Sequence, residues 1–99
     1  MTLQILLSII VSIIGADGEL SDVTVIVMDG PVYTKCLSDS GCLRVYDSKI
    51  FLNYGAITKT DDCGRTVLYH ELAHFKYPKL DIHTECKLNA KVVQWKNTA

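Results

Sequence analysis

The chain has 99 residues with a formal net charge of −1, and 48% of the residues are apolar. This length allows one domain at most. The charge balance argues against an electrostatic nucleic-acid binder, because such a protein needs a basic face to neutralise phosphates.

The first segment, residues 3–14, is almost purely apolar but shorter than the roughly 20 residues that span a bilayer as a helix. Small residues follow at Gly15, Ala16 and Gly18. This layout is typical of a secretory signal peptide. We therefore expect a signal peptide over residues 1–16 and a secreted, extracellular domain over residues 17–99. The alternatives are an uncleaved anchor or a buried first strand.

All four cysteines, Cys36, Cys42, Cys63 and Cys86, lie in the expected mature domain. A domain of about 80 residues buries too little surface for a strong core, and disulfides supply the missing stability. An even number of cysteines in a secreted chain indicates two disulfides. Cys36 could close locally on Cys42, which would leave Cys63 with Cys86, but the sequence does not fix the pairing. No C-x-x-C pair is present, so a cysteine zinc site is not expected.

Most of the chain has the composition of short strands. Residues 60–64 form the clearest predicted turn, because Asp accepts local backbone hydrogen bonds and Gly64 permits positive φ. Leu80, Ile82 and Thr84 alternate with polar residues, as in a half-buried strand. Strands are expected over residues 23–28, 32–36, 42–46, 80–86 and 90–95, with an extended segment over 50–58. About six strands with short turns indicate a small antiparallel β-sandwich or barrel.

Residues 66–77 fit a strand that enters a short helix. On a helix, one apolar face would contain Val67, Leu68, Leu72 and Phe75. Pro78 should end this helix near Lys76, because the residue before a proline avoids the α region.

The helical segment contains the motif His70-Glu71-Leu72-Ala73-His74. On a helix this spacing places both histidines on one face, where they could bind one zinc ion, and Glu71 would activate a water molecule on that ion. A catalytic zinc also needs a third protein ligand. His83 or Glu85 could supply it, but only through a very tight turn at Pro78.

The extension of this motif found in metzincins is absent, since Tyr77 and Leu80 stand where Gly and the third His belong. Short motifs also arise by chance. The favoured interpretation is therefore that His70, Glu71 and His74 lie on the surface without metal, with no catalytic residue and no cofactor. The zinc hydrolase is the alternative.

Three segments carry a resemblance to a known family. They are residues 43–47 (LRVYD), 58–65 (TKTDDCGR) and 78–86 (PKLDIHTEC). They are similar to a strand, a turn and a Pro-x-Leu strand of the nematode transthyretin-like family of small secreted proteins. The chain departs from that family at Cys63, which stands where the turn normally has Asn, and it ends before the family's last strands.

The resemblance implies a transthyretin-like β-sandwich that binds rather than catalyses. Its ligand would be a lipid, a cell-surface protein or a small apolar molecule. A truncated sandwich would also expose an edge strand, which invites homodimerisation. A secreted effector that binds a partner protein through its loops is a further alternative.

Overall fold

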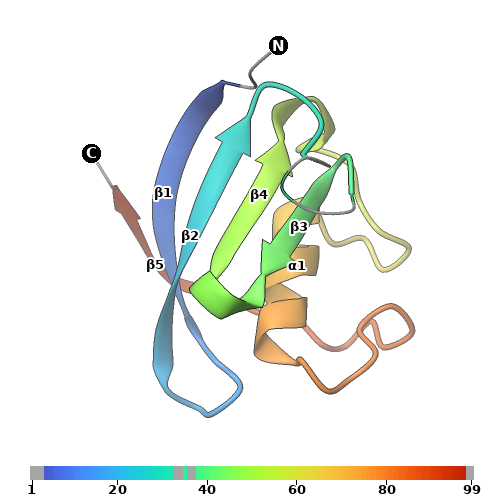
Figure 1. Cartoon of the computed structure of the whole chain (residues 1–99). Helices are drawn as coiled ribbons and strands as arrows, with labels where there is room; N and C mark the ends of the chain where they lie inside the picture. Colours follow the sequence, from blue (N-terminus) through green and yellow to red (C-terminus); the bar gives the residue numbers. More distant parts are fainter. Residues whose placement is uncertain (1–3, 33–34, 36–37, 98–99) are drawn as a thin grey trace.

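The structure is a computed structural model that describes residues 4–32, 35 and 38–97. Within these residues, the strands are β1 (Ile5–Ile14), β2 (Leu20–Met28), β3 (Gly41–Arg44), β4 (Lys49–Asn53) and β5 (Val92–Asn97). The α-helix is α1 (Val67–Lys76), and two short 3₁₀ helices are η1 (Val45–Asp47) and η2 (Tyr54–Ala56). Figure 1 shows the long β1–β2 hairpin beside the shorter strands β3 and β4, with α1 against one face of the sheet.

All of these strands belong to one sheet in the order β3-β4-β2-β1-β5. β1 pairs antiparallel with β2 on one side and with β5 on the other. β4 runs parallel to β2 and antiparallel to β3. In the described part of the chain, β3 and β5 are therefore the two edges of the sheet.

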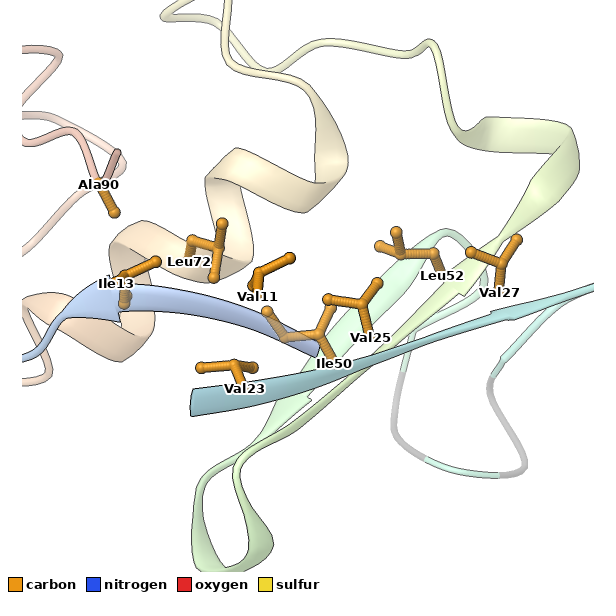
Figure 2. Packing of buried hydrophobic residues seen from close by; sticks show 9 residues of the cluster. All are labelled: Val11, Ile13, Val23, Val25, Val27, Ile50, Leu52, Leu72 and Ala90. Atoms are coloured by element: carbon orange, nitrogen blue, oxygen red, sulfur yellow. The ribbon is translucent and has the colours of Figure 1, made fainter. Parts of the chain in front are cut away.

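The main core lies between the sheet and α1. Strand side chains alternate between faces, and the valines at 23, 25 and 27 of β2 point to the same face as Ile50 and Leu52 of β4. In Figure 2, Val23, Val25 and Ile50 lie below Leu72 of α1, and Leu52 and Val27 lie farther along the sheet. The full cluster is Val11, Ile13, Val23, Val25, Val27, Ile50, Leu52, Leu72 and Ala90.

A smaller apolar cluster covers part of the opposite face. Ile26 and Met28 from β2 pack there with Val32 and Phe51. The guanidinium of Arg44 lies over the Phe51 ring at 4.8 Å from its centroid. Both faces of β2 are therefore buried over its second half, which explains its run of β-branched residues without polar alternation.

The predicted fold class is confirmed in its main terms: the protein is mainly β, with one short helix and a disulfide between Cys63 and Cys86. The described residues form one sheet and not the two stacked sheets of a sandwich. α1 and the loops cover the face that a second sheet would cover. The strand expected over residues 32–36 falls largely outside the described residues.

Residues 5–14, expected to be the apolar part of a signal peptide, form β1 in this structure. Val11 and Ile13 are fully buried in the core, and β1 has a hydrogen-bonded neighbour on each side. The second half of this apolar run suits a central strand that is screened from water, whereas Ile5, Leu6 and Leu7 at its start are about half exposed. The arrangement is the one that the buried-strand alternative predicts, and cleavage after residue 16 stays a prediction.

The strand predicted over residues 80–86 is wrong, because this segment is a series of turns. Asp81 is the local cause: its carboxylate accepts hydrogen bonds from the backbone N–H of His83 and from the Thr84 hydroxyl. Such Asp-centred turns compete with strand formation. Ile82 is nevertheless fully buried, while Leu80 is exposed.

None of the helices in the described ranges is long and apolar enough to cross a membrane.

Candidate metal centre

Helix α1 carries the two histidines of the motif, and its packing decides where they point. Its apolar side, with Leu72 fully buried and Leu68 and Phe75 partly buried, packs on the sheet. This confirms the predicted apolar face. His70 and His74, four residues apart, share a different side of the helix. The helix ends at Lys76, as Pro78 predicts.

The chain after α1 turns back and brings His83 to the helix. Leu80 N–H donates to the Tyr77 carbonyl, and the Asp81 turn follows. The ring centroid of His83 lies 4.9 Å from that of His70 and 5.0 Å from that of His74. The tight turn at Pro78 that a third ligand requires is therefore present.

His70, His74 and His83, called the histidine cluster below, are all of the histidines in the chain. One nitrogen from each ring lies within 4.8 Å of the others. Zinc binds imidazole nitrogen at about 2.0–2.1 Å, so three ligands around one ion lie about 3.3 Å apart. The rings would move together by about an ångström or more to bind zinc. His70 and His74 are partly buried and His83 is exposed, so one side of the cluster faces solvent.

Asp61 orients the first ring of the cluster. Its Oδ2 lies 2.7 Å from Nδ1 of His70, which leaves Nε2 as the free ligand atom of that ring. Metal-binding histidines commonly make this contact with a carboxylate, which fixes the ring and increases its basicity. Partial burial opposes ionisation of Asp61, but hydrogen bonds from His70, from backbone N–H groups and from the Arg65 side chain outweigh it. These bonds hold the pKa of Asp61 well below its usual range.

The pKa of His74 is lowered mainly by burial, and the neighbouring rings of His70 and His83 add to the effect. A neutral imidazole is the form that binds a metal ion. Burial also raises the pKa of Glu71 to about 7. The motif thus provides the two kinds of group that its chemistry requires, an imidazole shifted toward its neutral form and a carboxyl group partly screened from water.

Glu71 lies between two pockets that flank α1. One has a volume of about 280 Å³ and reaches from His70 and Glu71 to Lys59 and Gly41. The other, of about 350 Å³, is lined by Glu71, His74 and residues of β3 and η1. Glu71 therefore shares a pocket with each histidine of the motif.

The close approach of β3 to α1 depends on Gly41. A Cβ at this position would lie 2.5 Å from Cγ1 of Val67 and 3.1 Å from the Phe51 carbonyl oxygen. Glycine avoids both contacts, so the edge strand and the helix can lie side by side with the pockets at their junction.

The disulfide between Cys63 and Cys86, predicted as one of two pairings, connects the turn that carries Asp61 to the segment that carries His83. Cys42 is disulfide-bonded as well. Cys36 lies outside the described residues. The disulfide thus restrains the loop that supplies the third ring.

Sequence reasoning missed Arg65 and Asp61 as parts of this site. Both fall in the predicted turn, where acidic and basic residues are ordinarily solvated. The one available signal was their spacing around Cys63, since a disulfide there brings the turn close to residue 86.

The comparisons with models of protein families, with curated proteins and with solved structures found no match for this chain. The resemblance to the transthyretin-like family stays a prediction.

Proposed function

We propose that this protein is a zinc-dependent hydrolase of peptide substrates, with His70, His74 and His83 as zinc ligands and Glu71 as general base. The observation that carries the proposal is the convergence of every histidine in the chain on one point. Glu71 lines one pocket with His70 and another with His74. His83 comes from a loop and not from the helical motif, so helix periodicity alone does not account for its position.

The ligand set is that of a catalytic rather than a structural zinc. Structural zinc sites use four protein ligands, whereas catalytic sites use three and leave one position open. Zinc held by these three imidazoles would supply a Lewis acid that lowers the pKa of a water molecule toward 7. Glu71 would accept the proton from that water, and Asp61 would keep the ring of His70 in the orientation that binding requires.

A peptide is the substrate class that fits the surroundings. β3 is an edge of the sheet, and it pairs with β4 alone among the described strands. Its residues line both pockets that meet at Glu71. An extended peptide can add to an edge strand through main-chain hydrogen bonds, which would place a scissile bond beside the histidine cluster.

The test uses the full oxidised chain, purified without a histidine tag and loaded with zinc. Glu71→Gln should retain about one zinc per chain and lose at least about 100-fold in the rate of cleavage of a quenched fluorescent peptide library. Glu19→Gln, a carboxylate in the β1–β2 turn, serves as the matched control and should cleave as the unaltered chain does. Zinc-loaded protein that cleaves no peptide in the library would contradict the hydrolase function.

A second candidate is the binding function that the sequence predicts, with a lipid, a cell-surface protein or a small apolar ligand. The observation in its favour is exposed apolar surface on β1 and β5, where Leu7, Val93 and Trp95 are each about half exposed. Such surface often marks an interaction site. Trp95→Ala would weaken vesicle or partner binding under this hypothesis, and it would leave peptide cleavage unchanged.

A further inference from the structure

Arg65 is the one buried charged side chain in the described part of the chain, with 6% of its surface exposed. Each nitrogen of its guanidinium has a separate acceptor. Nε donates to Asp61 Oδ2 at 2.8 Å, Nη1 donates to the Leu88 carbonyl at 2.8 Å, and Nη2 donates to the Ile82 carbonyl at 2.5 Å. The charge is thus buried with complete hydrogen bonding.

The three acceptors lie next to two different members of the histidine cluster, His70 and His83. Asp61 Oδ2 is the same oxygen that contacts Nδ1 of His70. Ile82 directly precedes His83, and Leu88 closes the other end of the same loop. One guanidinium therefore contacts the partner of the first ring and the backbone that carries the third ring.

We propose that Arg65 is a positioning residue that couples two ligands of the zinc site, by holding Asp61 against His70 and holding the loop of His83 against the helix. This inference rests on the proposed zinc function and extends it. Arg65 does not itself touch the metal or the substrate, and it acts through Asp61 and through the carbonyls on each side of His83.

Only an arginine can make this set of contacts. Its planar group directs donors in three fixed directions, whereas the lysine ammonium is a compact charge on a flexible stem. A neutral residue such as methionine would leave a carboxylate and two carbonyls without their donor in a buried place. Arg65→Lys is therefore the informative variant, because it keeps the charge while losing the geometry.

Arg44 is the matched control, as the only other arginine in the chain. It also binds a carboxylate, that of Asp47, but at the β3 edge with its side chain about one quarter exposed. Arg44→Lys makes the same chemical change away from the histidine cluster.

The experiment measures the affinity of the full oxidised chain for zinc by competition with a chromophoric chelator. Arg65→Lys should lower the affinity about 10- to 100-fold, as substitutions of groups that orient metal ligands do. Arg44→Lys should stay within about twofold of the unaltered chain, as expected for a change remote from the ligands. The thermal midpoint of each metal-free variant separates lost stability from lost positioning.

A double-mutant cycle with Asp61→Asn tests the route of the coupling. If Arg65 acts partly by holding Asp61 on His70, then the two substitutions together should cost less affinity than the product of their separate effects. Unchanged zinc affinity in Arg65→Lys would overturn the inference, and so would strictly multiplicative effects in the cycle. Failure of the unaltered chain to bind zinc would instead overturn the proposed function.

Discussion

Two regions of the molecule bring the histidines together, and they are built differently. α1 carries His70 and His74 and is fixed by apolar packing, with Leu72 fully buried against the sheet. The segment from Tyr77 to Ala90 carries His83 and contains no α-helix or strand. Apart from the buried Ile82 and Ala90, it is held by the Cys63–Cys86 disulfide and by hydrogen bonds to Arg65.

This difference indicates that the positions of His70 and His74 depend on the overall stability of the domain. The position of His83 depends on the disulfide and on the hydrogen bonds of its segment to Arg65. Damage to the core should lower the free energy of unfolding without changing how well the folded protein binds metal. Loss of the disulfide or of the Arg65 hydrogen bonds should lower metal affinity by more than the accompanying loss of stability explains. The predictions below use this contrast, from the largest expected effect to the smallest.

Removal of residues 1–16 should have the largest effect. It takes away β1, which pairs with both β2 and β5 and contributes the fully buried Val11 and Ile13. We expect a chain that starts at residue 17 to lose its cooperative thermal unfolding transition, observed by circular dichroism. A cooperative transition in the shortened chain would show that β1 is dispensable. N-terminal sequencing of protein from an exporting cell tests the predicted signal peptide separately.

Leu72→Ala should destabilise the helix region by about 2–5 kcal/mol, because it opens a cavity in the core. Urea unfolding measures this change. Leu20→Ala is the control, since Leu20 lies on β2 with 55% of its surface exposed, and it should have a much smaller effect. The folded fraction of Leu72→Ala should still bind zinc as tightly as the unaltered chain. Weaker binding by the folded fraction would contradict the distinction between the two regions.

Replacing both Cys63 and Cys86 by serine should lower both the stability of the protein and its affinity for zinc, unlike Leu72→Ala. The loop closed by this disulfide spans 23 residues, and its loss should cost about 3 kcal/mol of stability by the chain-entropy model. Zinc affinity should fall at least about 10-fold as well, because His83 loses its covalent restraint. Lys87→Ala, beside Cys86, is the control that changes an exposed neighbour without cutting the cross-link. Unaltered affinity in the double serine variant would show that the disulfide does not position His83.

The smallest expected effect concerns Asp22 on β2, in the part of the sheet far from the histidines. The hydrogen bond from the Ser12 hydroxyl lowers the pKa of Asp22, and Lys96 adds to the effect. A carboxyl whose pKa is lower in the folded state stabilises the fold above its unfolded pKa of about 4, and this contribution is lost as the pH falls through the folded value. The thermal midpoint of Asp22→Asn should therefore differ from that of the unaltered chain at pH 7, and the difference should shrink below about pH 4. A gap that stays constant down to pH 2 would contradict this assignment.

The sequence predicts the sheet and helix well where apolar periodicity is long. The β-branched run at 23–28 and the helical face of Leu68, Leu72 and Phe75 both appear as expected. The alternation of apolar and polar residues at 80–86 led to a wrong strand prediction. The pattern is short, and the hydrogen bonds of Asp81 favour turns over a strand. Residues 5–14 satisfy two patterns at once, since a signal peptide and a buried strand need the same apolar run.

For the site, the motif and the candidate third ligand could be named from the sequence, but their convergence could not. It depends on a turn after Pro78 whose direction is set by contacts far along the chain, chiefly those of Arg65 with the Ile82 and Leu88 carbonyls. Such contacts leave no periodic signal. The roles of Asp61 and Arg65 are for the same reason visible only in three dimensions.

The measurement that tests the central claim most directly is the zinc content of the full oxidised chain, purified without a chelator or a histidine tag, by elemental analysis after dialysis. We expect about one zinc per chain, as for a single catalytic site. It should be lost in His70→Ala and His74→Ala and weakened in His83→Ala. No bound zinc in the unaltered chain would contradict the account, and so would variants that all retain as much zinc as the unaltered chain.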